Sequence, residues 1–378
     1  MAGKLARSVM LGGGNYDRNS ALQAGVVRLA AGRLEQAVRA LASTAQSFGA
    51  AQSFSATQSF GSAQSFSAAQ VPSPARPLCL VDYGSATGKN AIAAMTHVGA
   101  LFAEHRPGVP LSLGFCDQPE NDWRALASHL HDAFASREDV TVAMLPRSFY
   151  GPVLAPGSVD LGWSAIAVHW LSERPGVPIE HLWPHAKLGP KRAPFSERAG
   201  RDWKLFLHAR ARELRQGGQL VVVAACSRDD GTSTADDYLD VPWEVLGELE
   251  RSGDLLPDER GAMHVPTYFR SAAEWKAPFA DSELGLELRD YGEELLPDGL
   301  WEAFERSGDR HAFAAAWVGW LRAFSEPLLA AALSPTREPE PRRALLDELY
   351  RRTTERIARE PERARIPWTL AVLHAAKA

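Results

Sequence analysis

Residues 78–90 read LCLVDYGSATGKN and join a short apolar run to a turn that contains two glycines. The run from Leu78 to Asp82 is continuous rather than alternating, which is typical of a strand buried on both faces of a parallel sheet. Gly84 and Gly88 let the backbone turn tightly and let a ligand approach without a Cβ in the way. The stretch therefore predicts a buried strand with a binding turn at its carboxyl end.

The spacing of these glycines narrows the class of ligand. It is not the GxGxxG pattern of dinucleotide sites, and it lacks the GK[ST] ending of phosphate loops. The departures favour an adenosyl ligand without a pyrophosphate, and they argue against a nicotinamide dehydrogenase.

Strands and helices alternate after this turn. A helix over about residues 90–104 leads to a second apolar run at 111–116, which ends at Asp117. Strand, turn, helix and strand make the βαβ unit of a doubly wound sheet. The fold class is therefore α/β, and further strands are predicted at 140–144, 158–165 and 219–224.

Two aspartates close successive strands of this unit. Asp82 ends the first strand and Asp117 the second, where a carboxylate can accept both hydroxyls of a ribose. Taken alone, each is equally well explained as a cap or turn aspartate. Their shared position beside the glycine turn favours a nucleoside site.

The segments before the first strand differ sharply from each other. Residues 20–42 have apolar side chains near helical spacing, with Asn19 or Ser20 as the cap. Residues 43–70 repeat Gln-Ser-Phe every six residues and carry no charge. This composition predicts a disordered loop or linker, and an arm that contacts a partner is the alternative interpretation.

The carboxyl-terminal part of the chain is predicted to be mostly helical. Strand patterns fade beyond Asp229, and helices rich in tryptophan and leucine follow, for example over 243–251 and 311–324. Such a cap would cover the carboxyl edge of the sheet, where open α/β sheets bind ligands. We expect four parts. Residues 1–42 form an N-terminal motif and helix that close the site, and residues 43–77 form a low-complexity linker or loop. Residues 78–228 form the α/β core that binds the donor, and residues 229–378 form a mostly helical cap with the acceptor pocket.

Composition excludes several classes of protein. The 378 residues are 45% apolar and carry a formal charge of −5, so the chain can bury a large core and lacks the clustered basic face of a nucleic-acid protein. Cys79, Cys116 and Cys226 suit a reducing cytoplasm, because they are too few and too far apart for a disulfide framework. No apolar run reaches the roughly 18 residues of a membrane span, and glycines at 12–14 interrupt any signal-peptide core. We expect a soluble cytoplasmic protein with neither nucleic acid nor membrane as a partner.

An ordered set of motifs resembles the SABATH methyltransferases, the family of salicylate, benzoate, jasmonate and indole-acetate carboxyl methyltransferases and of the caffeine-pathway N-methyltransferases. Residues 10–23 (MLGGGNYDRNSALQ) resemble its amino-terminal motif, residues 82–90 its LGCSSGPN turn, and residues 116–123 (CDQPENDW) its NDLPGNDF segment. The order of the matches makes the resemblance specific, and it continues at 147–151, 168–172, 202–207, 217–218, 265–268 and 324–329.

The resemblance implies a fold, a methyl donor and a site. The fold is a Rossmann-like class I methyltransferase sheet with a mostly helical cap, and the donor is S-adenosylmethionine. Gln23 and Trp170 match the pair that holds the substrate carboxylate, and His169 and Trp243 match positions in the acceptor pocket, although each aromatic residue alone would be interpreted as core. The residues implied to surround the donor are Tyr16, Ser20, Asp82, Gly84, Ser85, Gly88, Asn90, Asp117, Gln118, Ser148 and Phe149.

Two departures from the family pattern bear on the acceptor and on metals. Within residues 163–167 (WSAIA), Ile166 replaces a frequent tyrosine of the family, so a hydrogen bond to the acceptor is lost and that side of the pocket is more apolar. Residues 261–264 (GAMH) stand where some relatives offer acidic and amide ligands to a structural metal. We therefore expect no metal.

The expected reaction is O-methylation of a small-molecule carboxylic acid to its methyl ester. A carboxylic acid with a pKa of about 4 is already ionised at neutral pH, so positioning suffices and no catalytic base is expected. Trp170 and Gln23 would orient the carboxylate as neutral hydrogen-bond donors. Two alternatives stay open: N-methylation of a heterocycle held by His169, and an inactive nucleoside-binding protein that acts through protein contacts. The acceptor also stays open, as does a homodimer, which members of the family often form.

Overall fold

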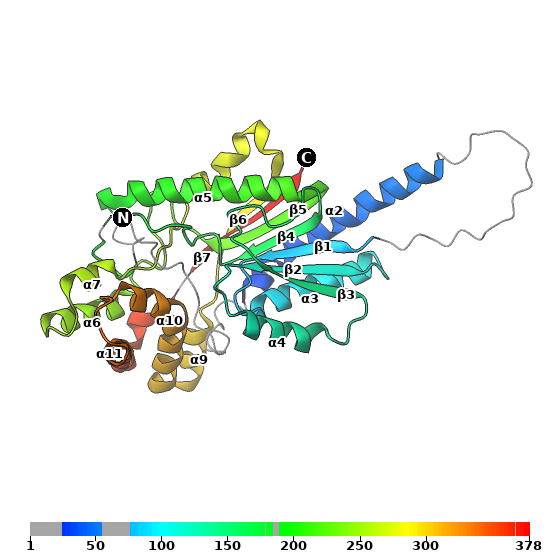
Figure 1. Ribbon diagram of the computed structural model, residues 1–378. Helices are drawn as coiled ribbons and strands as arrows, with labels where there is room; N and C mark the ends of the chain where they lie inside the picture. The colour runs from blue at the N-terminus through cyan, green and yellow to red at the C-terminus, as the bar shows by residue number, and fades with distance from the viewer. Residues whose placement is uncertain (1–24, 55–75, 178, 184–188, 367) are drawn as a thin grey trace, which may run out of the picture.

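The computed structural model describes residues 25–54, 76–177, 179–183, 189–366 and 368–378 (Figure 1). Helices and strands alternate up to the fifth strand, as predicted for an α/β fold, except that no helix separates the third strand from the fourth. In chain order the longer elements are α2 (Val26–Phe54), β1 (Leu78–Tyr83), α3 (Lys89–His105), β2 (Leu111–Asp117), α4 (Trp123–Phe134), β3 (Val140–Pro146), β4 (Val159–Ala165), α5 (Arg192–Glu213), β5 (Leu214–Ala225), α6 (Asp240–Arg251), α7 (Pro257–Ala262), α8 (Ala272–Lys276), β6 (Leu286–Leu295), α9 (Gly299–Ser307), α10 (Arg310–Ala332), α11 (Pro339–Arg359) and β7 (Thr369–Lys377).

The strands form one seven-stranded sheet in the order β3-β2-β1-β4-β5-β7-β6. β1 pairs in parallel with β2 on one side and with β4 on the other, so Asp82 has Phe115 and Trp163 as its cross-strand neighbours. The chain steps outward from β1 to β3 and then crosses back to β4. The strand order therefore reverses between β1 and β4, and open α/β sheets bind ligands at the carboxyl ends of the strands at such a point.

Two apolar layers enclose the sheet. Leu80 and Leu113 belong to the buried cluster that includes α2, α3 and α4, whereas Val81 and Tyr83 belong to the cluster formed with α5. Figure 1 shows α2, α3 and α4 on one face and α5 on the other. The continuous apolar run of β1 is thus buried on both faces, as predicted.

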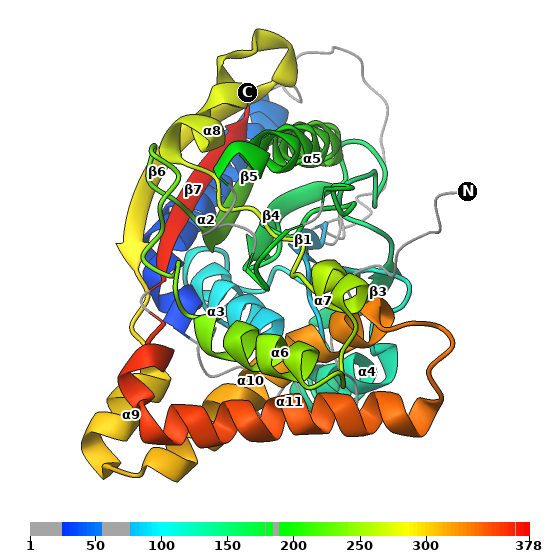
Figure 2. The same cartoon turned by 90° about the vertical axis from the view of Figure 1, so that its left-hand side faces the viewer.

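The carboxyl-terminal part is more than the predicted helical cap. β7 inserts between β5 and β6 and is antiparallel to both, so two strands of the sheet come from residues beyond 229. Their patterns hid them, because half of β6 is charged and β7 is dominated by alanine and leucine, which do not favour strands. The helices of this part, α6, α7 and α9 to α11, gather at the end of the sheet where β1 and β2 stop (Figures 1 and 2).

Helix α2 confirms the predicted N-terminal helix from Val26 onward. It buries Val26, Leu34 and Val38 among other apolar residues and runs on to Phe54. Residues 43–54, expected as part of the linker, are therefore helical. Alanine and glutamine favour helices and no proline interrupts them, so the helix continues although the six-residue repeat does not match its period. The predicted cap at Asn19 or Ser20 and the rest of the repeat lie outside the described residues.

Within the described ranges, no helix combines the length and the hydropathy that crossing a membrane requires.

Candidate functional site

The turn after β1 has a backbone that only a few residue types adopt easily. Gly84, Ala86 and Gly88 have φ angles of 105°, 46° and 99°, and a side chain is strained in this region. A Cβ at Gly84 would lie 2.3 Å from the Cβ of Ala167, in the segment after β4. The Gly84 amide also donates to the carbonyl of Cys116 at 2.8 Å. The turn therefore holds the ends of β1, β2 and β4 close together.

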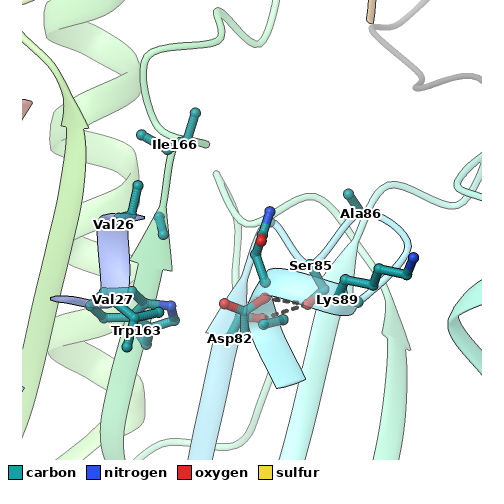
Figure 3. Close-up of a pocket in the computed structure, with 13 residues that line it drawn as sticks. Val26, Val27, Asp82, Ser85, Ala86, Lys89, Trp163 and Ile166 are labelled. Carbon is teal, nitrogen blue, oxygen red and sulfur yellow. Dashed lines mark hydrogen bonds between the residues drawn. The ribbon is translucent and has the colours of Figure 1, made fainter. Parts of the chain in front are cut away.

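The two predicted aspartates lie beside this turn. Asp82 is 2% exposed and accepts a 2.5 Å hydrogen bond from the hydroxyl of Ser85 (Figure 3). Asp117 is half-buried, and its two carboxylate oxygens accept the amides of Ala86 and Gln118, each at 2.7 Å. A carboxylate oxygen can accept more than one hydrogen bond, so both side chains keep acceptor capacity for a ligand.

Desolvation sets the electrostatics of this pair. Burial raises the pKa of Asp82 from 3.8 to about 7, against the hydrogen bond from Ser85, and the nearby Asp117 raises it further. Burial also raises the pKa of Asp117, although the two amide bonds favour its charged form. A cation bound beside two carboxyls in this state would favour their ionisation. The arrangement is therefore suited to a positively charged ligand.

A cavity adjoins Asp82 at the point where the strand order reverses. In Figure 3, Asp82 and Ser85 lie on one side of it, and Val26, Val27 and Trp163 lie on the other. It brings together five of the predicted donor residues, Asp82, Gly84, Ser85, Gly88 and Asn90. Its full lining is Val26, Val27, Asp82, Gly84, Ser85, Ala86, Gly88, Lys89, Asn90, Ala91, Trp163, Ala165 and Ile166.

Ile166 adds both an apolar wall and strain to this cavity. Its φ is 55°, and its amide donates to the carbonyl of Val223 at 2.8 Å. A β-branched residue in the left-handed region is an outlier that costs on the order of 1–2 kcal/mol. Strain of this kind gathers where backbone geometry serves a site, and here it fixes the direction of the chain between β4 and His169.

Ser148 and Phe149 lie in the loop after β3. A Cβ at Gly84 would be 3.7 Å from Cε1 of Phe149, so this loop borders the turn. The Phe149 ring is buried and packs against Tyr150 and Phe206. Neither Ser148 nor Phe149 lines the cavity itself.

A buried ion pair, which sequence reasoning missed, holds this loop. Arg210 and Glu213 on α5 are fully buried and lie 3.0 Å apart. Arg210 donates to the carbonyls of Phe149 at 2.7 Å and Gly151 at 3.1 Å, and Glu213 accepts the Tyr83 hydroxyl at 2.8 Å. An arginine and a glutamate three residues apart on a helix usually form an exposed pair. The apolar residues that surround them in α5 were the only signal in the sequence.

The structure places His169 and Trp170 next to the loop of Ser148 and Phe149. Tyr150 donates its hydroxyl to the carbonyls of Val168, at 3.3 Å, and Trp170. Burial, together with Arg270, lowers the pKa of His169 to about 3, so its ring is neutral at pH 7. Trp170 is half-buried and does not line the cavity at Asp82.

Trp243 lies apart from these residues. It is on α6, where the Arg260 guanidinium covers its ring at 4.0 Å and the His181 ring is 5.6 Å away. No residue of α6 lines the cavity at Asp82. The role of Trp243 in the acceptor pocket stays a prediction, and the geometry around Trp243 does not support it.

Three predicted site residues, Tyr16, Ser20 and Gln23, lie outside the described residues. Gln118, which the structure does describe, has a buried Oε1 atom, and the described part of the chain provides no hydrogen-bond partner for it. The described residues also hold no group of three or more His, Cys, Asp or Glu side chains that could bind a metal ion. Two carboxyls beside a glycine turn and a buried amide oxygen without a partner among the described residues together fit a nucleoside that carries positive charge.

Comparison with known proteins agrees with this chemistry. Residues 62–375 match the model of the SAM-dependent carboxyl methyltransferase family. Methyltransferase LUC1 of Fusarium sp is 30% identical over 52% of this chain and 53% of its own, and O-methyltransferase acrG of Aspergillus aculeatus is 30% identical over 56% and 57%. The chain thus spans just over half the length of these two relatives. Gibberellic acid methyltransferase 2 of Arabidopsis thaliana is 25% identical over 76% of this chain and 79% of its own.

The fold has a counterpart among solved structures. A loganic acid methyltransferase structure with SAH covers 97% of this chain and 98% of its own, with a TM-score of 0.74 and 18% sequence identity. At that identity the likeness concerns the fold, which is a class I methyltransferase sheet with added helices.

Proposed function

The chain belongs to the family of S-adenosylmethionine-dependent carboxyl methyltransferases, and on this premise we propose that it methylates the carboxylate of a small molecule to form a methyl ester. The observation that carries the proposal is the pair of carboxyls, Asp82 and Asp117, at the ends of β1 and β2 beside the turn. Their raised pKa values favour a ligand that brings positive charge, as the sulfonium donor does.

We assign the donor to the cavity at Asp82 and to the loops beside it. Asp117 would accept the ribose hydroxyls, Asp82 would face the positively charged part of the donor, and Gln118 would offer its unpartnered Oε1. The narrow turn suits this ligand, because the backbone at Gly84 can approach it without a Cβ. By resemblance, the donor shell also includes Tyr16, Ser20, Gly84, Ser85, Gly88, Asn90, Ser148 and Phe149.

The acceptor would lie where the start of α2 meets the end of β4. Val26 and Val27 line the cavity, and Gln23 precedes Val26 by three residues, a stretch of chain that spans at most about 11 Å. Gln23 is therefore within reach of the site, which supports the proposal that residues 1–42 close it. Trp170 would provide the second donor to the carboxylate, and His169 a neutral neighbour.

Methyl transfer at this site needs no proton transfer. When bound, the donor supplies a methyl group already activated on its sulfonium. A lone pair of the carboxylate oxygen forms the new bond to the methyl carbon, and the electrons of the broken carbon–sulfur bond go to sulfur. The indole N–H of Trp170 and the amide of Gln23 hold the carboxylate in line, and as neutral donors they leave it nucleophilic. Val26, Val27 and Ile166 exclude water from it.

We further propose that the protein acts in the cytoplasm as a homodimer, without nucleic acid or membrane partners. The unpaired state of Cys79, Cys116 and Cys226 supports the location. The formal charge of −5 argues against a nucleic-acid partner.

Trp170→Phe tests the acceptor assignment. The variant keeps an aromatic ring and loses one hydrogen bond to a charged group, so kcat/KM for the preferred acid should fall about 10- to 100-fold. Calorimetric affinity for the donor should stay unchanged. Trp320→Phe is the matched control, because Trp320 is 3% exposed in the core cluster that contains α10, and it should keep the wild-type kcat/KM. Full activity of Trp170→Phe on the acid would contradict the assigned role.

A further inference from the structure

The last two residues of β1, Asp82 and Tyr83, direct their side chains to opposite faces of the sheet, because side chains alternate along a strand. Leu80 belongs to the buried cluster that includes α2, α3 and α4, and Tyr83 belongs to the cluster formed with α5. Asp82, two residues after Leu80, therefore lies on the side of the cavity (Figure 3). The orientation of the strand end sets the direction of Asp82, and Tyr83 can hold that end from the opposite face.

On the side of β4, side chains take over from the backbone ladder at the end of β1. The pairing of β1 with β4 stops at Asp82. Beyond it, the Ser164 hydroxyl donates to the Tyr83 carbonyl at 2.7 Å, and the Tyr83 hydroxyl donates to Oε2 of Glu213 at 2.8 Å. Gly84 follows and has no side chain. Tyr83 is therefore the last residue before the glycine turn whose side chain can anchor the strand.

Both the ring and the hydroxyl of Tyr83 are held in place. The side chain is fully buried, and the guanidinium of Arg210 lies 3.9 Å from the centroid of the ring. Gly162 of β4 leaves room for the ring, because a Cβ there would be 3.2 Å from Cε2 of Tyr83. Burial raises the pKa of Tyr83 well above its usual value. The hydroxyl therefore keeps its proton and stays a donor to Glu213.

The carboxylate of Glu213 divides its contacts between two segments. Oε1 accepts the amides of Val153 at 2.5 Å and Leu154 at 3.1 Å, in the loop after β3. Oε2 accepts the Tyr83 hydroxyl. Arg210 donates to both oxygens, at 3.0 and 3.1 Å. Removing the Tyr83 hydroxyl therefore releases the end of β1 and leaves the hydrogen bonds of the loop in place.

Stability alone does not explain the buried pair of Arg210 and Glu213. Burying two charges carries a desolvation penalty that their attraction only roughly offsets, and well-packed apolar residues of the same volume often serve stability equally well. Apolar residues could not hold a tyrosine hydroxyl and the backbone groups of a loop at the same time. The pair joins the two segments that border the glycine turn, which indicates a role in placing them.

We propose that Tyr83 is a positioning residue for the methyl donor: through Glu213 it fixes the end of β1, and with it the direction of the Asp82 carboxyl. Tyr83 does not line the cavity, so it acts through Asp82 and not by contact. The proposal rests on the assignment of the donor to the cavity at Asp82. Its buried anchor lies on α5, on the opposite face of the sheet from α3 (Figure 1).

Donor affinity of Tyr83→Phe tests this role. The variant keeps the ring and loses one hydrogen bond to a charged group, so the dissociation constant for S-adenosylmethionine should rise about tenfold. Calorimetry of the full chain without acceptor, at about pH 8, measures it with Asp82 ionised. Tyr268→Phe is the matched control, because the buried Tyr268 also donates to a glutamate, Glu274, at 2.7 Å under an arginine, Arg192. It should keep the wild-type donor affinity.

A double-mutant cycle shows whether Tyr83 acts through Asp82. Asp82→Asn should weaken donor binding by itself. In the Asp82→Asn background, Tyr83→Phe should change the dissociation constant less than about threefold, because the group that it places is already altered. A merely structural role would give the same loss in both backgrounds. Circular dichroism confirms that each variant is folded at the temperature of the titration.

Three results would overturn the proposal. An unchanged donor affinity in Tyr83→Phe, or an equal loss in Tyr268→Phe, would remove the positioning role. A full tenfold loss in the Asp82→Asn background would show that Tyr83 acts elsewhere. If only Asp82→Asn weakened donor binding, Tyr83 would have no part in the site and the proposed function would stand. If Asp82→Asn also kept the wild-type affinity, the placement of the donor itself would be wrong.

Discussion

At the scale of single residues, Asp82 connects the fold of the site to its charge. It is the last residue but one of β1, it is almost fully buried, and the Ser85 hydroxyl donates a hydrogen bond to it. Its pKa of about 7 lies above the unfolded value of 3.8. The stability that this carboxyl contributes is therefore fully present below pH 3.8 and is lost as the pH rises through about 7. A positively charged donor at the proposed site would bind the ionised form and would reverse this loss.

Donor affinity should therefore depend on pH through Asp82. Below about pH 7 the carboxyl is protonated in the free protein, and the dissociation constant for S-adenosylmethionine should rise by up to about tenfold per pH unit. Above pH 8 the affinity should reach a plateau. Isothermal titration calorimetry between pH 5.5 and about 8.5 measures this dependence.

Asp82→Asn is the control for this prediction, since it keeps the shape and removes the titration. Its donor affinity should be weaker than that of the wild type above pH 7, and any remaining pH dependence would belong to the donor. Without donor, the free energy of unfolding of the wild type should fall relative to the variant as the pH rises through 7. Identical pH profiles for the two proteins would contradict the role of Asp82.

Residues whose position in the fold follows from local sequence were the predictable ones. Asp82 and Asp117 stand at the ends of apolar runs, and the βαβ pattern alone places them at one edge of the sheet. Arg210 and Glu213 could not be predicted, because their burial depends on packing between α5 and a loop about sixty residues earlier in the chain. The surroundings of Trp243 depend likewise on Arg260, which belongs to a different helix.

At the scale of elements, two loops at the carboxyl edge are joined by one side chain. Tyr150 belongs to the loop beside the proposed donor site, and its hydroxyl donates to the carbonyls of Val168 and Trp170, in the segment that we propose holds the acceptor. Arg210, on α5, donates to the carbonyl of Phe149 in the first loop. The buried Arg270 donates to the carbonyl of Val168 in the second loop, at 2.7 Å. The two loops to which we assign donor and acceptor are thus held together by polar contacts.

Tyr150→Phe should disturb this arrangement without opening the donor site. The Trp170 carbonyl loses its donor while the Val168 carbonyl keeps Arg270, which costs about 1–3 kcal/mol of stability. The KM for the acceptor should rise and kcat should fall, with kcat/KM about tenfold lower, while the donor affinity stays within about twofold of the wild type. Steady-state kinetics with calorimetry would measure both effects.

Tyr350→Phe is the matched control for Tyr150→Phe. Its buried hydroxyl bonds to Ser325 at 3.0 Å, between α11 and α10, so the substitution should lower stability without changing KM or kcat. If both variants changed the kinetics equally, the effect of Tyr150 would be one of general stability. An unchanged acceptor KM in Tyr150→Phe would contradict its positioning role.

Elements were predicted well where hydrophobic periodicity decided them. The five parallel strands and the helix after the glycine turn occupy the expected ranges, because buried parallel strands leave continuous apolar runs. β6 and β7 were not predicted. β6 is an exposed edge strand of which half the residues are charged, and β7 is rich in alanine, and neither pattern is typical of a strand. The extension of α2 to Phe54 was missed because a repeat with a six-residue period hides a helix built on alanine.

At the scale of the whole molecule, three distant parts of the chain meet at one point. The start of α2, the turn after β1 and the end of β4 all line the cavity where the strand order reverses. The helices from the carboxyl-terminal part cover the same end of the sheet (Figure 2). The α/β class and the placement of Asp82 and Asp117 at one edge of the sheet followed from the sequence, whereas the seven-strand order required the structure.

Transfer of a labelled methyl group tests the central claim most directly. The full chain would be incubated with methyl-labelled S-adenosylmethionine and a panel of aromatic, indole and terpenoid acids, with xanthines in parallel, and the products identified by mass spectrometry. The account predicts a labelled methyl ester of at least one acid, together with an equal amount of S-adenosylhomocysteine. Label on a ring nitrogen without any ester, or no S-adenosylhomocysteine with any acceptor, would contradict it.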